Sequence, residues 1–75
     1  MLIHEAVRKA MKQDKEIYRQ SAKRDYPDRY ATIKPTNSYE ACLLIINTEN
    51  KKKSCRNWNP TADDLMANDW EVAME

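Results

Sequence analysis

Apolar residues near the start of the chain recur with the spacing of one helix face. Within residues 4–13 they lie three to four positions apart, and lysine and arginine fill most positions between them. The apolar positions are Ala6, Val7, Ala10 and Met11. Because side chains three and four residues apart share one side of an α-helix, this spacing predicts an amphipathic helix with a solvated basic face.

Shorter segments further along the chain have the composition of β-strands. Within residues 41–47, Cys-Leu-Leu-Ile-Ile is the one continuous apolar run, which is typical of a strand covered on both faces. Turn-forming residues follow it, so we expect the chain to return as a hairpin partner. The polar segment 21–28 is expected to be a loop. The strands predicted in this way are 15–20, 29–34, 41–47, 53–58 and 69–74.

A second, shorter helix is predicted over residues 62–68. Thr61 has the side chain of a helix N-cap, and Asp64 stands three residues later, where a capping box places its acid. The order of elements predicts a single α+β domain over residues 1–75, with a small antiparallel sheet, one N-terminal helix and one short C-terminal helix.

Chain length and pattern together predict an oligomer. A domain of 75 residues buries only about 60% of its unfolded surface, so a lone monomer is marginally stable. One helix can cover one face of the sheet, and the apolar strand at 41–47 needs cover on its other face. We therefore expect a second subunit to supply that cover.

Composition narrows the chemistry of the protein. The chain has no glycine, where about five would be average, and this excludes glycine-dependent phosphate loops. Backbone positions with positive φ are then expected to fall mainly to asparagine. The sequence has neither an apolar run of membrane-spanning length nor the pattern of a signal peptide, so we expect a cytoplasmic protein without a membrane partner.

Charge divides the chain into two parts. Residues 1–56 carry a net charge of +6, and residues 57–75 carry five acids and no base. The two parts can attract each other within the fold or across a subunit interface, or form a basic surface beside an acidic one that suits a nucleotide. The acidic segment would repel a phosphate backbone, which makes nucleic acid an unlikely partner.

The residues do not form a catalytic constellation. His4 is the only histidine, and Cys42 and Cys55 lack the two further ligands of a metal site, so we expect free thiols packed on neighbouring strands. Asp63 and Asp64 are adjacent and suit helix capping better than paired catalysis. We expect a binding protein without metal or cofactor, rather than an enzyme.

Aromatic residues are the best candidates for binding. Trp58 and Trp70 flank the short helix, and each either packs in the core or offers a flat face to a nucleotide base. For phosphate, Arg19 is the first candidate, because its planar fork can hold two oxygens. The alternative for Arg19 is an ion pair with the acidic C-terminal segment, and Arg56 is a further cation.

The segment from Trp58 to Val72 resembles the signature of the Thoeris anti-defence type two proteins of phages and prophages. A tryptophan is followed by a threonine three residues later, an aspartate six later, and Asp69-Trp70 at eleven and twelve. The family's opening is matched by Glu5-Ala6 and by Ile17-x-Arg19.

Two positions depart from the family pattern. Asp14 replaces a usual glycine, and Ala22 replaces an aromatic residue that often lines the ligand pocket. Tyr26 or Tyr30 is a possible substitute for that aromatic.

The resemblance implies a homotetramer that binds and sequesters cyclic ADP-ribose isomers made by TIR-domain enzymes, without cleaving them. Some relatives also hold cyclic dinucleotides at separate sites. The ligand-binding residues expected on these grounds are Trp58, Asp64, Arg19, Thr61, Asn59, Tyr30, Trp70 and Arg56. The alternative function is that of a small oligomeric phage regulatory or structural protein that binds nucleic acid or a protein partner.

Overall fold

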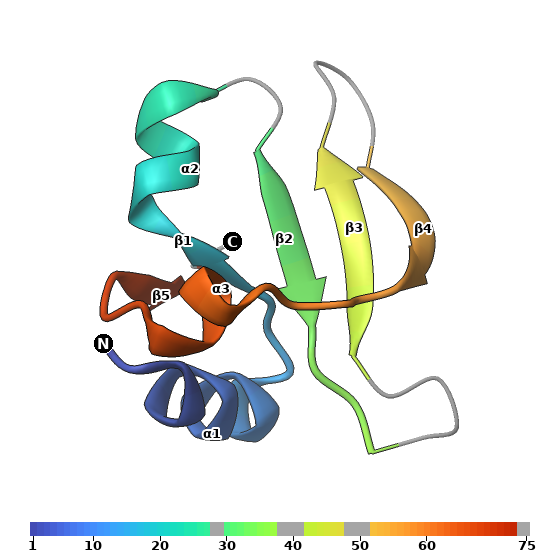
Figure 1. The fold of residues 1–75 in the computed structure, drawn as a ribbon. Helices are drawn as coiled ribbons and strands as arrows, with labels where there is room; N and C mark the ends of the chain where they lie inside the picture. Colours follow the sequence, from blue (N-terminus) through green and yellow to red (C-terminus); the bar gives the residue numbers. More distant parts are fainter. Residues whose placement is uncertain (28–29, 38–41, 48–51, 74–75) are drawn as a thin grey trace.

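In the part of the chain that it describes, the computed structural model forms a five-stranded antiparallel sheet with three helices (Figure 1). It describes residues 1–27, 30–37, 42–47 and 52–73, and the side chains at 46, 47 and 52–56 lie outside that description. The elements in chain order are α1 (Ile3–Gln13), β1 (Ile17–Arg19), α2 (Gln20–Asp25), β2 (Ala31–Lys34), β3 (Leu43–Asn47), β4 (Lys52–Asn57), α3 (Ala62–Met66) and β5 (Trp70–Val72). The predicted α+β class and antiparallel sheet are confirmed.

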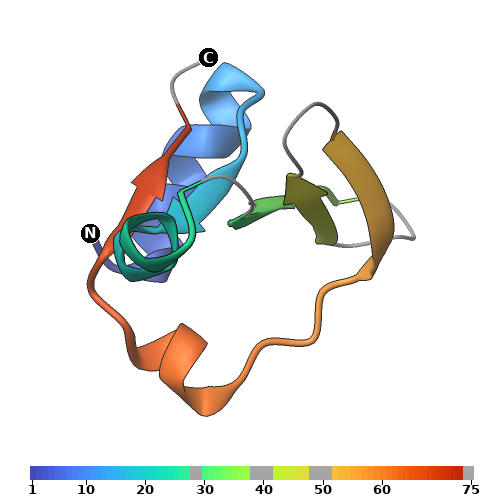
Figure 2. The same ribbon diagram turned by 90° about the horizontal axis from the view of Figure 1, so that it is seen from above.

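The strand order places the last two strands at opposite edges of the sheet. The order is β4-β3-β2-β1-β5, so the chain must cross the sheet between β4 and β5. We call residues 58–69, which make this connection and carry α3, the crossover segment. Figure 2 shows it passing along one side of the sheet. The crossover segment contains most of the family-like motif, so the fold extends that motif across one face.

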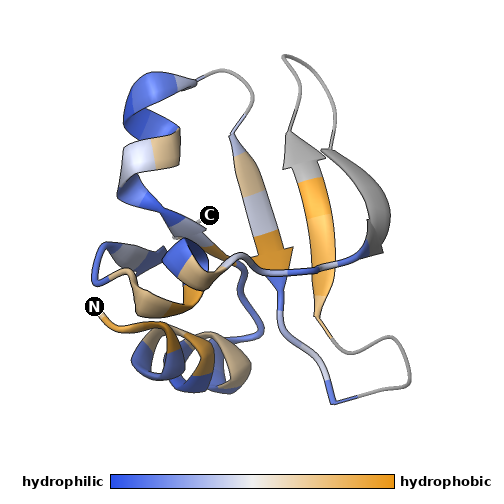
Figure 3. Cartoon of the chain, in the orientation of Figure 1, coloured by the Kyte–Doolittle hydropathy of each residue, from blue (hydrophilic) through white to orange (hydrophobic). Residues whose placement is uncertain are grey.

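A row of apolar residues across the sheet forms the core. Ile17 pairs in register with Ile33 on one side and with Val72 on the other, and Leu44 pairs with Ile33. Because paired residues point to the same face, this row forms a continuous apolar surface, and α1 packs against the part of it on β1 and β5. Ile17, Ile33 and Val72 are buried. Figure 3 shows hydrophobic colour along the described length of β3, in contrast to the mostly hydrophilic α2.

Helix α1 confirms the amphipathic helix predicted from the apolar spacing. Ala6 and Ala10 are fully buried in the core cluster, and α1 contacts both β1 and β5. The helix is followed by Asp14, whose φ of 55° and ψ of 49° lie in the left-handed region. Among the described residues this position falls to aspartate rather than to asparagine, and a short polar side chain tolerates that region.

Helix α2 corrects the loop predicted over residues 21–28. The chain enters a helix directly after β1, because Asp69 supplies acceptors for its first two amide groups. The Gln20 N–H donates to the Asp69 carbonyl, and the Ser21 N–H donates to Asp69 Oδ2, both at 3.0 Å. A helix needs such partners for its free N-terminal amides, and here they come from a distant part of the chain.

The remaining elements follow the sequence prediction closely. Every predicted strand is present, and the described ends lie within two residues of the expected ones. The predicted ends at residues 29, 41 and 74 lie outside the described residues. The hairpin of β3 and β4 is confirmed, and the short helix ends at Met66 rather than at residue 68. Within the described residues, no helix has the length and apolar character needed to cross a bilayer.

Candidate functional site

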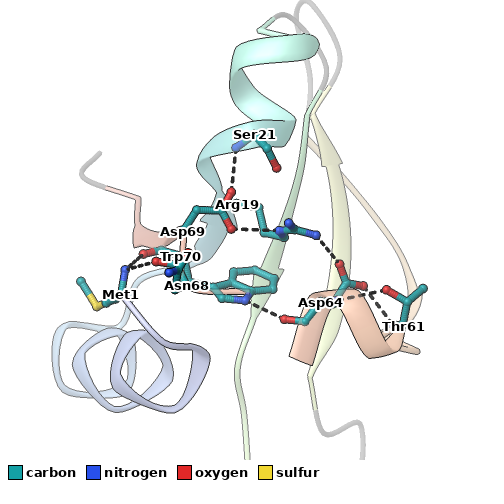
Figure 4. Close-up of polar contacts among 8 residues, drawn as sticks. All are labelled: Met1, Arg19, Ser21, Thr61, Asp64, Asn68, Asp69 and Trp70. Atoms are coloured by element: carbon teal, nitrogen blue, oxygen red, sulfur yellow. Dashed lines mark hydrogen bonds and ion pairs between the residues drawn. The ribbon is translucent and has the colours of Figure 1, made fainter. Parts of the chain in front are cut away.

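Arg19 binds two acidic residues of the crossover segment, Asp64 and Asp69 (Figure 4). It lies at the end of β1, opposite Trp70 in the sheet register. Its Nε donates to Asp69 Oδ1 at 3.1 Å, and its Nη1 donates to Asp64 Oδ1 at 3.3 Å. We call Arg19, Asp64 and Asp69 the Arg19 cluster. The ion pair that the sequence left open as an alternative for Arg19 is therefore present.

The hydrogen bonds within the Arg19 cluster shift the pKa of two of its groups. The hydrogen bond to Asp69 raises the pKa of Arg19 above its ordinary value, although burial opposes this. Burial also opposes ionisation of Asp69, but the hydrogen bonds from Ser21 and Arg19 outweigh it and lower the pKa of that carboxyl. Both groups are therefore held in their charged forms.

Thr61 and Asp64 form the start of α3 as predicted. The Asp64 N–H donates to Thr61 Oγ1 at 3.1 Å, and the Thr61 N–H donates to Asp64 Oδ2 at 3.0 Å. This reciprocal pair is the capping box expected from the sequence. Asp64 therefore uses one carboxylate oxygen to cap α3 and the other to bind Arg19.

Trp58 and Trp70 contact each other, but only one of the two rings is accessible to solvent. Trp70 is 1% exposed, and its Nε1 donates to the Asp64 carbonyl at 2.8 Å. The Trp58 ring packs edge-on against it, with centroids 5.7 Å apart and planes at 79°. Because Trp58 is only half-buried, it is the tryptophan that keeps surface free for a ligand.

Trp58 forms one wall of an open groove beside α1. The groove has a volume of about 680 Å³, within the range of about 300–1,000 Å³ common for small-molecule sites. Its apolar lining residues are Ile3, Val7, Met11, Cys42 and Trp58, and its polar ones are His4, Arg8, Lys12 and Asn37. The sequence predicted that the basic face of this helix is solvated, so Arg8 and Lys12 were not among the predicted site residues. The available signal for these two cations was their four-residue spacing, which places them on one side of the helix next to the apolar positions.

Tyr30 lies in a different cluster from the tryptophans. Its ring centroid is 5.3 Å from that of Tyr18, and Lys23 Nζ lies 5.2 Å from the Tyr18 centroid and 5.7 Å from the Tyr30 centroid. Successive residues of a strand point to opposite faces, so Tyr18 and Arg19 project from opposite sides of β1. The structure therefore does not bring Tyr30 together with the Arg19 cluster.

The other predicted site residues are dispersed or outside the description. Asn59 is exposed on the crossover segment, and the side chain of Arg56 lies outside the described residues. Cys42 is a free, half-buried thiol, whereas the side chain of Cys55 is not described. Among the described residues, no group of three or more metal-ligating side chains comes together.

The fold and the site define a class of protein: a small α+β domain in which a crossover segment packs the half-buried Trp58 against the buried Trp70 and is joined to β1 through the Arg19 cluster. The chain belongs to the Thoeris anti-defense 2-like (Tad2-like) domain family, whose model matches residues 1–73. No curated protein and no solved structure matches the chain at a significant level. The family resemblance inferred from the motif at residues 58–72 is thereby confirmed.

Proposed function

We propose that this chain is a phage-encoded anti-defence protein that binds a cyclic ADP-ribose-type immune signal in the host cytosol and sequesters it without cleaving it. Membership of the anti-defence family supports the biological role. The observation that carries the chemical part is the half-exposed Trp58 ring, which lines a groove together with the cations of α1.

The groove matches the parts of such a ligand. The face of Trp58 suits a purine, since aromatic rings stack on nucleotide bases. Arg8 and Lys12 stand one helix turn apart at the same groove and can meet the two phosphates of a pyrophosphate. We propose that the base lies on Trp58 and the phosphates lie towards α1.

We propose that the acidic side chains of the crossover segment meet the ribose hydroxyls of the ligand. An ionised carboxylate has about four acceptor positions, so Asp64 retains capacity beyond its bonds to Thr61 and Arg19. Asn59 is exposed nearby in sequence and offers a further amide. Tyr30 and Arg56 remain predicted ligand residues. Trp70 is buried and supports the Trp58 ring by packing against it.

The proposed assembly is a homotetramer. Leu43 and Ile45 alternate with Leu44 on β3 and lie on the face away from the core row, where both are only half-buried in the single chain. A second subunit over this face would complete their burial.

The proposed binding site is tested by isothermal titration of a panel of cyclic ADP-ribose isomers and cyclic dinucleotides. We expect Trp58→Ala to weaken binding of the preferred cyclic ADP-ribose isomer by roughly 5- to 150-fold, because a base–aromatic stack contributes about 1–3 kcal/mol. Met66→Ala is the matched control, since Met66 is a large apolar residue on the same crossover segment that is 71% exposed and does not line the groove. Equal affinities for the two variants would exclude Trp58 from the site.

A further inference from the structure

The Arg19 cluster connects the starts of two helices. Asp69 accepts the first amide groups of α2, and Asp64 caps α3 through Thr61. Arg19 binds the side chains of both acids with two different nitrogens, Nε and Nη1 (Figure 4). One guanidinium therefore ties together the caps of α2 and α3, whose first residues are 42 positions apart in the chain.

The same contacts continue to the wall of the groove. The carbonyl of Asp64 accepts the indole N–H of Trp70 at 2.8 Å, and the Trp70 ring packs against Trp58. Trp70 also lies directly across the sheet from Arg19. These contacts form a continuous path from Asp64 through Trp70 to the aromatic ring that lines the groove.

The three side chains are shielded enough for these contacts to matter. Their exposed fractions are 28% for Arg19, 24% for Asp64 and 25% for Asp69, so none is a freely solvated surface charge. Ion pairs in such partly buried positions are less screened than exposed ones. Two of the five guanidinium N–H donors are engaged by carboxylates that also hold the starts of α2 and α3.

We infer that Arg19 is a positioning residue, which sets the place of Trp58 by joining Asp69 and Asp64, rather than a group that contacts the ligand phosphate. This inference rests on the proposed function for its effect on binding, but its structural part does not. A lysine at this position would keep the charge, but its single ammonium nitrogen does not have the fixed planar geometry with which Nε and Nη1 of arginine hold the two acids.

The structural part is tested without ligand, by recording the two tryptophan indole N–H resonances in ¹H–¹⁵N spectra. We expect Arg19→Lys and Asp69→Asn each to move the resonances of both Trp70 and Trp58 and to speed hydrogen exchange at the Trp70 indole. Wild-type resonances in both variants would overturn the inference. This outcome is independent of any nucleotide, so it is distinguishable from a failure of the proposed function.

The binding part uses the cyclic ADP-ribose isomer that the panel above selects. Positioning predicts at least a tenfold loss of affinity in both Arg19→Lys and Asp69→Asn, whereas direct phosphate binding predicts that Asp69→Asn frees Arg19 and keeps or raises affinity. Ile33→Val, which removes one methyl group from the core on β2, is the control for lost stability. Unchanged affinity in Asp69→Asn would contradict positioning. Positioning would also be contradicted if Ile33→Val, at the same melting temperature as Arg19→Lys, lost as much affinity as Arg19→Lys.

Discussion

At the scale of single residues, the hydrogen bonds of Asp69 link the Arg19 cluster to the pH dependence of stability. The pKa of Asp69 lies below its ordinary value of 3.8, because hydrogen bonds from Ser21 and Arg19 outweigh the effect of burial. A carboxyl whose pKa is lower in the folded than in the unfolded chain stabilises the fold at pH values above its unfolded pKa. That stabilisation is lost as the pH falls through the folded pKa.

We therefore expect the free energy of unfolding to decrease as the pH drops through and below 3.8, and Asp69→Asn to remove part of this decrease. Urea unfolding at a series of pH values from 7 to 3 measures it. Asp63→Asn is the control, because Asp63 is an exposed acid in the same part of the chain. If Asp69→Asn kept the full pH dependence of the wild type, Asp69 would not be the group responsible.

At the scale of elements, the sequence identified the helices whose signals are local. The apolar spacing located α1, and Thr61 and Asp64 located the start of α3, because the capping box lies within four consecutive residues. The sequence did not predict α2, because the acceptor for the first amides of that helix is Asp69, which lies 48 residues beyond Ser21 in the chain. No local pattern carries that information.

The candidate site divides in the same way. Trp58, Thr61 and Asp64 lie on one crossover segment and were found from a linear motif. The pairing of Arg19 with two acids was foreseen only as an alternative, because charge alone does not specify whether the anion is a phosphate or a carboxylate. Tyr30 lies in a separate cluster with Tyr18 and Lys23, which the sequence did not predict, because residue order does not show on which face of the sheet a side chain lies.

The cap of α3 gives a prediction at this scale. Thr61→Ala should lower the free energy of unfolding by about 1 kcal/mol, since it removes the acceptor for the Asp64 N–H. For a domain of this size that corresponds to roughly 4–8 °C in melting temperature, measured by circular dichroism. Thr61→Ser should retain most of the stability, because serine keeps the hydroxyl. A loss in the serine variant equal to that in the alanine variant would show that the methyl group, not the cap, stabilises α3.

At the scale of the whole molecule, the proposed assembly predicts that a second subunit covers the face of β3 that carries Leu43 and Ile45. We expect light scattering at micromolar concentration to give a mass close to four times the 8.9 kDa of one chain. Leu43→Lys, which places a charge on the half-buried face of β3, should shift the mass towards the monomer. A wild-type protein that scatters as a single chain would contradict the proposed assembly.

The central claim is that the protein captures a cyclic ADP-ribose-type signal and leaves it intact. The most direct measurement is to incubate the protein with that signal, remove unbound nucleotide, denature the protein by heat, and identify the released molecule by mass spectrometry and chromatographic comparison with the starting compound. We expect the unaltered signal to be recovered in a fixed ratio to protein chains. Recovery of a linear or hydrolysed product would identify an enzyme instead, and absence of any retained nucleotide would contradict sequestration.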